Sequence, residues 1–209
     1  MKPSPARIKE VTRAAYDQYP ERFGEFFQRS FLDNGVARFV EGFAAQFPQN
    51  AVVADLGSGP GYHARAIAAL SQVANVVCLD LSMAMLQQCQ GLLAVNGDLE
   101  FLPLRSQSFD GVWAFTSLLH LPRRAVRPAL AEVGRILKPG GVFALAVKEG
   151  SGGGFEDRRD FPGAVRWFTY FSEQGFRRYF GRQSWELLDF ERTLATAPHP
   201  FLNYLFRKR

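Results

Sequence analysis

Residues 52–68 read VVADLGSGPGYHARAIA and join a strand, a glycine-rich turn and the beginning of a helix. Residues 51–56 are apolar apart from Asp55, which is typical of a strand buried on both faces of a parallel sheet. The glycines that follow let the backbone turn sharply and approach a ligand closely. A strand, a glycine turn and a helix in this order predict a pocket of the nucleotide-binding kind.

Strands and helices continue to alternate beyond this unit. Further buried strands are predicted at residues 75–81, 92–98, 110–117 and 142–150. Helices are predicted at 61–71, at 82–90 with Ser82 as N-cap, and at 127–141, ended by Pro139-Gly140-Gly141. This alternation predicts an α/β fold with a doubly wound parallel sheet, whose ligand lies outside the carboxyl ends of the strands.

The two ends of the chain are expected to differ from the alternating core. Residues 151–163 (SGGGFEDRRDFPG) predict a glycine-rich loop, residues 172–181 a short helix, and residues 184–193 and 201–209 two closing strands. We therefore expect one domain over residues 1–209. Its expected parts are a helical lid or cap at 1–47, a ligand-binding core at 51–148, and a substrate-side loop with closing strands at 149–209.

The composition is that of a globular protein with a mildly basic surface. The net charge is +5 over 209 residues, and no block of five or six basic residues occurs, so nucleic acid is not expected as a partner. Cys78 and Cys89 are the two cysteines and form no CxxC or Cys/His cluster, so no metal site is expected. Neither a signal core nor a run of ~18 apolar residues occurs, so we expect a cytoplasmic protein without a membrane partner.

Carboxylates follow the first three predicted strands, at Asp55, Asp80 and Asp98. Asp80 stands roughly 20 residues after Gly61, the spacing at which an acidic residue accepts both hydroxyls of a ribose. Adenosyl and dinucleotide cofactors share that feature, and the glycine pattern alone does not separate them.

Asp55 discriminates between these two cofactor classes. A pyrophosphate at the glycine turn would lie beside this carboxylate, with like charges in a poorly solvated crevice. S-adenosylmethionine carries an ammonium and a sulfonium but no phosphate, so it suits the same place. Asp55 is expected to orient the turn and attract the cationic amino end; a cap for the glycine turn is a second, compatible role.

Four motifs in order resemble the class I S-adenosylmethionine-dependent methyltransferases, especially their small type 11 group. They are VVADLGSGPG (52–61), LDLSMAML (79–86), GDLEFLPLRSQSFDGVWAFTSLLHL (97–121) and LAEVGRILKPGGVFALAVKEG (130–150). The resemblance implies a Rossmann-like sheet of seven strands with an antiparallel last strand, which agrees with the two predicted closing strands.

The resemblance also implies which residues contact the cofactor. The turn beside the methionine part would consist of Asp55, Gly57, Ser58, Gly59 and Gly61, and the ribose would be bound by Asp80. The adenine would be surrounded by Leu81, Met85, Asp98 and Leu99. Thr116 would lie beside the cofactor after the fourth strand. The apolar members equally suit ordinary core positions, Asp98 a turn, and Thr116 a strand-end hydroxyl.

The acceptor side carries weaker signals. His120, just past the fourth strand, is a candidate base for a hydroxyl acceptor, with a turn-capping or packing role as the alternative. An N-terminal tyrosine covers the cofactor in related methyltransferases, and Tyr16 or Tyr19 is the nearest match here. Lys148 and Tyr170 are further candidates for the substrate side and lid. Basic residues near the fifth strand that suit an anionic substrate also include Arg158, Arg159 and Arg166, the first two more typical of a solvated surface.

The favoured function is methyl transfer from S-adenosylmethionine to a small-molecule acceptor. An RNA or protein methyltransferase is the alternative among enzymes, although FTSL (115–118) stands where base-amine methyltransferases carry an Asn/Asp-Pro-Pro-Tyr/Phe tetrapeptide. A cofactor-binding regulatory protein without turnover is the alternative of another class.

Overall fold

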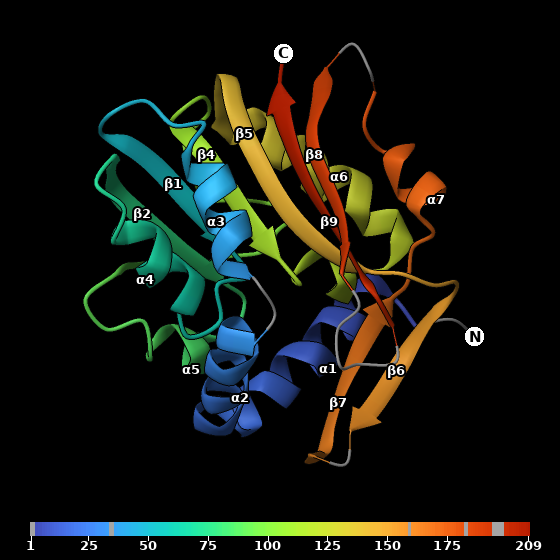
Figure 1. The fold of residues 1–209 in the computed structure, drawn as a ribbon. Helices are drawn as coiled ribbons and strands as arrows, with labels where there is room; N and C mark the ends of the chain where they lie inside the picture. The colour runs from blue at the N-terminus through green and yellow to red at the C-terminus, as the bar shows by residue number, and fades with distance from the viewer. Residues whose placement is uncertain (1–2, 34–35, 159, 182–183, 194–198) are drawn as a thin grey trace.

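The computed structural model describes residues 3–33, 36–158, 160–181, 184–193 and 199–209. A seven-stranded sheet runs through its centre in the order β3-β2-β1-β4-β5-β9-β8 (Figure 1). The strands are β1 (Ala51–Leu56), β2 (Val73–Asp80), β3 (Leu93–Asn96), β4 (Phe109–Phe115), β5 (Leu137–Lys148), β8 (Trp185–Thr193) and β9 (Phe201–Lys208). Strands β1 to β5 pair in parallel, whereas β9 runs antiparallel to both β5 and β8. The seven strands and the antiparallel last strand expected from the sequence are confirmed.

Each face of the sheet is covered by its own set of helices. Alternate strand residues point to opposite faces, so Ala54 and Val112 join the core under α6 (Arg123–Ile136) and α7 (Glu173–Arg177). Their neighbours Val53 and Trp113 join the core under α3 (Val36–Ala44), α4 (Tyr62–Ala68) and α5 (Met83–Leu86). Because both faces are buried, the central strands read as continuous apolar runs.

A third layer covers the carboxyl ends of the strands. It consists of α1 (Pro5–Gln18), α2 (Pro20–Asp33) and an antiparallel hairpin of β6 (Gly153–Arg158) and β7 (Phe161–Thr169). These elements lie together at the lower end of the sheet in Figure 1. Their own apolar cluster includes Phe23 and Phe161, whose rings stack 3.9 Å apart. The layer faces the sheet edge at which doubly wound folds bind ligands.

Two local predictions are wrong. Residues 151–163 were expected to form a glycine-rich loop, but most of them belong to the β6–β7 hairpin, in which Phe155 pairs with Trp167. The helix predicted at 127–141 begins earlier, after Pro122 as N-cap, and ends at Ile136. Pro139-Gly140-Gly141 therefore does not terminate it but lies in the first part of β5.

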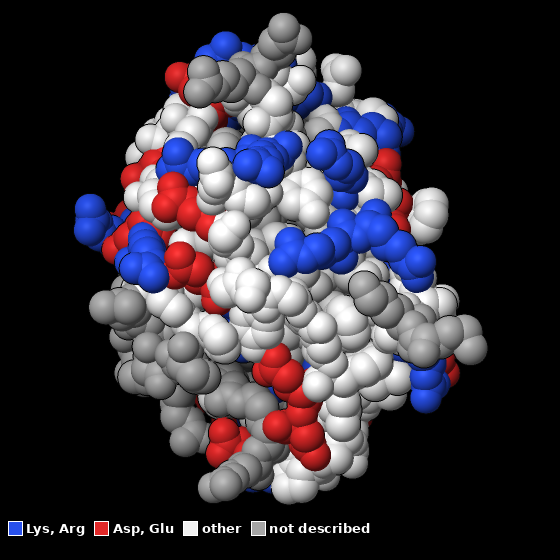
Figure 2. All heavy atoms as spheres, turned by 90° about the vertical axis from the view of Figure 1, so that its right-hand side faces the viewer, with Lys and Arg blue, Asp and Glu red and all other residues white. Residues whose placement is uncertain are grey.

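Lys and Arg side chains occupy the upper part of the face on the right of Figure 1, with uncharged residues between them and acidic residues beside and below (Figure 2). Within the described ranges no helix is long and apolar enough to cross a membrane. The same residues hold no cluster of His, Cys, Asp and Glu suited to a metal ion.

Candidate active site

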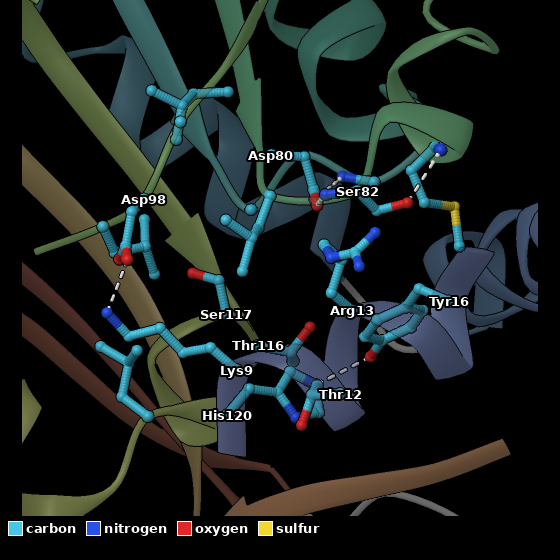
Figure 3. A pocket seen from close by; sticks show the side chains of 18 of the residues that line it. Lys9, Thr12, Arg13, Tyr16, Asp80, Ser82, Asp98, Thr116, Ser117 and His120 are labelled. Atoms are coloured by element: carbon cyan, nitrogen blue, oxygen red, sulfur yellow. Dashed lines mark hydrogen bonds and ion pairs between the residues drawn. The ribbon is translucent and has the colours of Figure 1, made fainter. Parts of the chain in front are cut away.

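A pocket opens between the carboxyl ends of the strands and α1. The space within it, including the part open to solvent, is about 790 Å³. Figure 3 shows Asp80 and Asp98 on one side and the side chains of α1 on the other. Residues from six segments line it: Lys9, Thr12, Arg13 and Tyr16; Phe27; Gly57 and Gly59; Leu79, Asp80, Leu81, Ser82 and Met85; Gly97, Asp98 and Leu99; Thr116, Ser117, His120 and Leu121.

The glycine turn after β1 forms one wall of the pocket. Gly57, Gly59 and Gly61 all have left-handed backbone angles, with φ of 71°, 53° and 81°, which glycine adopts readily. A Cβ on Gly57 would lie 2.3 Å from the Cβ of Ser117, so the turn can approach β4 only without a side chain there. Above Gly59, by contrast, a Cβ would meet only the ring of Phe27 at 4.0 Å, so the backbone there faces open pocket.

Asp80, the last residue of β2, ties the turn to the next loop. The Gly59 N–H donates to its Oδ2 (2.9 Å), and the Ser82 N–H donates to its Oδ1 (2.8 Å). Burial raises the pKa of Asp80, while these backbone donors lower it. A carboxylate has about four acceptor positions, so Asp80 retains acceptor capacity toward the pocket.

Asp98 faces the pocket from the loop after β3 and pairs with α1. Lys9 Nζ donates to its Oδ2 (2.6 Å) and also pairs with Glu100. Burial is the largest single influence on the pKa of Lys9 and lowers it. The two carboxylates together outweigh burial, so the pKa is raised. Lys9 is therefore a cation held between two carboxylates, and it anchors α1 over this end of the pocket.

Asp55 lies beneath the glycine turn and does not line the pocket. It is 1% exposed, and its Oδ2 has no hydrogen-bond partner. Burial, followed by the influence of Cys89 and Asp80, raises its pKa well above the usual range. The Ala64 N–H in the first turn of α4 has the opposite effect, so Asp55 helps hold that helix start.

Tyr16 and His120 meet across the pocket. The Tyr16 hydroxyl lies 2.7 Å from His120 Nε2, and His120 Nδ1 lies 2.6 Å from the carbonyl oxygen of Trp167. A carbonyl only accepts, so Nδ1 carries the proton. Nε2 of the neutral ring therefore accepts a hydrogen bond from the Tyr16 hydroxyl. Burial and the positive charges of Arg166 and Lys148 lower the pKa of His120 to about 3.

The segment after β4 adds strained and unpaired groups. Thr116 has a φ of 59°, which is uncommon for a β-branched residue and is found mainly at functional sites. Ser117 is 7% exposed, and its hydroxyl has no partner among the described residues. An unpaired buried hydroxyl in a pocket wall is suited to hydrogen bonding with a ligand.

Most of the predicted site residues lie in this one pocket. Those that line it are Tyr16, Gly57, Gly59, Asp80, Leu81, Met85, Asp98, Leu99, Thr116 and His120. Those that do not are Tyr19, Asp55, Ser58, Gly61, Lys148 and Tyr170. Tyr170 instead donates to Glu156, and Tyr19 donates to the Pro162 carbonyl (3.1 Å), which links the end of α1 to the hairpin. The Arg159 prediction lies outside the described residues.

Three lining residues of α1 were not expected from the sequence. Lys9, Thr12 and Arg13 stand with Tyr16 at helical spacing, which places them on one face of the helix. Counting back from Tyr16 along the helix in steps of three and four residues identifies them from the sequence.

Residues 54–145 match a family model described as a methyltransferase domain. The core of this chain is therefore similar to methyltransferase domains. The chain is similar to the malonyl-[acyl-carrier protein] O-methyltransferase of Dechloromonas aromatica (strain RCB), at 36% identity over 146 residues, which is 69% of this chain and 52% of the relative. It is also similar to the sarcosine/dimethylglycine N-methyltransferase of Aphanothece halophytica, at 35% identity over 109 residues, which is 47% of this chain and 38% of the relative.

The chain spans about half, or less, of the length of these curated relatives. A solved structure resembles all of it: the Burkholderia thailandensis 1,6-didemethyltoxoflavin-N1-methyltransferase, bound to 1,6-didemethyltoxoflavin and S-adenosylhomocysteine. The TM-score is 0.75 at 22% identity, covering 100% of this chain and 92% of that chain. The likeness shows that the whole chain shares that fold.

The pocket fits S-adenosylmethionine. The backbone at Gly59 faces space that a side chain would fill, and Gly57 lets the turn pack closely against Ser117. The unpaired buried oxygen of Asp55 lies below it, and a nearby cation would lower the raised pKa of that carboxyl. Asp80 and Asp98 provide acceptors at successive strand ends, with Leu81, Met85 and Leu99 as apolar walls between them.

Proposed function

We propose that residues 1–209 act as one methyltransferase domain, which transfers a methyl group from S-adenosylmethionine to a small-molecule acceptor. The observation that supports this most strongly is the convergence of the glycine turn, Asp80 and Asp98 on one pocket. The relatives are named as O- and N-methyltransferases, so their names support the reaction class and not one acceptor atom. A cytoplasmic setting, expected from the sequence, is part of the proposal.

Each pocket wall has a proposed role toward the cofactor. Asp80 accepts the ribose hydroxyls, and Asp98 accepts from the adenine amino group. Leu81, Met85 and Leu99 pack around the adenine ring, and the backbone at Gly57 and Gly59 contacts the methionine part. When bound, S-adenosylmethionine supplies a methyl group bonded to a sulfonium sulfur. Loss of the methyl group leaves that sulfur as a neutral sulfide. The residues therefore act chiefly by holding the acceptor in line, an effect that supplies up to ~7–11 kcal/mol of a barrier.

His120 is proposed to orient the acceptor rather than to store its proton. A general base works best when its pKa lies near the working pH, whereas the pKa of His120 is lowered to about 3. At neutral pH its Nε2 is a fixed hydrogen-bond acceptor, directed by the Nδ1–H bond to the Trp167 carbonyl. The Tyr16 hydroxyl donates to Nε2 in this structure. When the methyl acceptor binds, its hydroxyl either replaces Tyr16 at Nε2 or donates to the Tyr16 oxygen.

Helix α1 and the hairpin are proposed to close the acceptor side. Tyr16 reaches His120, and Tyr19 reaches the hairpin at Pro162. Closure over the acceptor excludes water and completes the site. Tyr170 and Lys148 contact the hairpin: the Tyr170 hydroxyl donates to Glu156, and Lys148 Nζ lies 3.9 Å from the ring centre of Phe168.

Calorimetric titration tests the cofactor assignment. We expect S-adenosylhomocysteine and S-adenosylmethionine to bind, and NAD to bind at least tenfold more weakly, because a pyrophosphate at the turn would lie close to Asp55 and Asp80. Tighter binding of NAD than of S-adenosylhomocysteine would contradict the proposal. Transfer of a labelled methyl group to a metabolite set, to RNA and to protein then separates the small-molecule enzyme from polymer methyltransferases and from a binding protein without turnover.

A further inference from the structure

Arg166 on β7 is a buried cation with one unused edge. It is 3% exposed, and its Nη1 donates to the Tyr16 hydroxyl (3.3 Å). Its Nε and Nη2 have no partner. These two N–H groups point the same way from one edge of the planar guanidinium, the fork that binds both oxygens of a carboxylate side by side.

The surroundings of Arg166 stabilise its charge without satisfying that edge. Its Cζ lies 4.8 Å from the ring centre of Phe23, 5.3 Å from that of Phe168 and 5.4 Å from that of Tyr16. Ring faces attract a cation but do not replace hydrogen-bond acceptors. Its cross-strand neighbour Glu156 accepts from the Tyr170 hydroxyl instead, and no described carboxylate forms an ion pair with Arg166. A buried charge without a counter-ion is costly, which favours a ligand as the missing partner.

Arg166 lies directly behind the acceptor end of the pocket. Tyr16 and His120 line the pocket, and Arg166 bonds to the first and lowers the pKa of the second. Lys148 adds a second positive charge near the same place, with its Nζ 3.9 Å from the ring centre of Phe168. Asp80 and Asp98 lie apart from this end (Figure 3). Asp80 and Asp98, the second of them paired with Lys9, thus lie where the cationic cofactor is proposed, and Arg166 and Lys148 lie near the proposed acceptor end.

We propose that the methyl acceptor carries a carboxylate, and that Arg166 binds this carboxylate together with the Tyr16 hydroxyl. The inference rests on the proposed function. The unused edge offers two N–H donors, which match the two oxygens of a carboxylate. The rings of Phe23, Phe161 and Phe168 lie close to the guanidinium, and they add no donors for the additional oxygen of a phosphate. Phe23 and Tyr16 belong to α2 and α1, so movement of these helices exposes the edge to the acceptor.

Matched neutral and anionic probes test this inference on the full chain saturated with S-adenosylhomocysteine. The probes are benzoate with benzamide and phenylacetate with phenylacetamide, titrated by calorimetry or ligand-observed NMR at pH 7.5, with phenyl phosphate as a third anion. Each acid should bind at least tenfold more tightly than its amide, because the amide supplies no charge to the guanidinium.

Variants assign the preference to Arg166. In Arg166→Met the acid-to-amide ratio should fall below about twofold, while affinity for S-adenosylhomocysteine stays within about twofold. Arg124→Met, which removes an exposed arginine of α6, should keep the full ratio. Arg166→Lys should keep a reduced preference, since it retains the charge without the fork, and it replaces the Met variant in the test if that variant does not fold.

Three outcomes overturn the inference: acids and amides that bind the wild type equally, a preference that survives in Arg166→Met, or phenyl phosphate bound tenfold more tightly than benzoate. The first result in a protein that binds S-adenosylhomocysteine leaves the proposed function standing. Failure to bind S-adenosylhomocysteine at all would instead overturn the proposed function.

Discussion

Each carboxylate oxygen of Asp80 accepts a backbone hydrogen bond before any ligand is considered. One bond fixes the glycine turn at Gly59, and the other fixes the start of α5 at Ser82. The single side chain therefore positions two pocket walls while its remaining lone pairs face the pocket. At the scale of one residue, loop geometry and the proposed ribose contact depend on the same atoms.

We expect Asp80→Ala to weaken binding of S-adenosylhomocysteine by at least tenfold. Two hydrogen bonds to a charged acceptor are lost, each of about 1.5–3 kcal/mol, and ~1.4 kcal/mol corresponds to a factor of ten. The turn at Gly59 also loses its anchor, so the melting temperature should fall, but the sheet should still form because Asp80 ends its strand. Calorimetry and a melting curve measure both effects, with Asp189→Ala on exposed β8 as control. An unchanged Kd in folded Asp80→Ala would refute the ribose role.

His63 gives a pH-dependent prediction away from the pocket. It lies against the rings of Trp113 and Phe115, and burial lowers its pKa from 6.5 to about 4. Between these values the unfolded chain binds a proton that the folded chain does not, so stability is lost as pH falls from 6.5 toward 4. We compare the free energies of unfolding of His63→Phe and the wild type. When the pH falls from 7.5 to 5, their difference should shift by about 2 kcal/mol in favour of the variant. Urea unfolding at both pH values measures this difference. An equal loss of unfolding free energy in both proteins between pH 7.5 and pH 5 would contradict it.

Helix α1 has one face built for the pocket and several anchors that hold it there. Thr12 accepts from the Trp167 N–H of β7 (3.0 Å), Asp17 accepts from the Ser82 hydroxyl (2.6 Å), and Lys9 pairs with Asp98. Polar anchors of this kind can break and re-form without opening the main cores. At the scale of one element, these anchors and the buried side chains of Ile8 and Ala15 define the closed position of α1.

We expect Lys9→Met to loosen α1. It removes a cation between Asp98 and Glu100 and leaves two carboxylates facing each other, so the unfolding free energy should fall by about 1 kcal/mol. Hydrogen exchange over residues 5–18 should accelerate more than exchange in β4 and β5. Arg7→Met is the matched control, because its pair with Glu10 on the same helix is exposed and should contribute little. Equal exchange in both variants would show that the Lys9 pair does not hold the helix.

The elements that the sequence predicts best are those with an unambiguous pattern. Strands β1 and β4 and the second half of β5 are buried on both faces, and the turn at Gly57 needs a residue without a side chain for a reason visible in the structure. The hairpin was missed because Gly153, Gly154 and Gly163 resemble a loop, although Phe155 and Trp167 pair across it. Local composition does not encode that pairing, which depends on α1 packing against β7.

The pocket residues divide in the same way. Asp80, Asp98 and Thr116 follow strands of the parallel core, so their meeting at one edge follows from topology. The unused edge of Arg166 could not be predicted, because it depends on how Phe23 and Phe168, far apart in the chain, enclose the guanidinium. Sequence position marked Arg166 as near the site but did not indicate that it is buried.

The whole molecule couples these layers through one sheet. Both faces of the central strands are buried in large cores, and the third layer packs where β1, β2 and β4 end. A ligand at that edge contacts the glycine turn, α5 and α1 together. Binding is therefore expected to stabilise the entire fold rather than one segment.

We expect S-adenosylhomocysteine to raise the free energy of unfolding by about 2.7 kcal/mol at a free concentration of 100 times its Kd. Circular dichroism and tryptophan fluorescence should report the same denaturant midpoint, because both cores share the central strands. NAD at the same concentration should raise the free energy of unfolding by at most about 1.4 kcal/mol, because it binds at least tenfold more weakly. Separate midpoints for the two signals would show that the third layer unfolds independently.

The position of β9 has a consequence for how the chain folds as it is synthesised. In the described part of the chain β8 pairs with β9 alone, and β9 also completes the open side of β5. Since residues 201–208 come after β8, the nascent chain presents two unpaired strand edges until this segment leaves the ribosome. At ~5–20 residues per second the interval is brief, but exposed edges recruit other chains. Premature truncation before residue 201 should therefore yield an aggregating product and a substrate for holding chaperones.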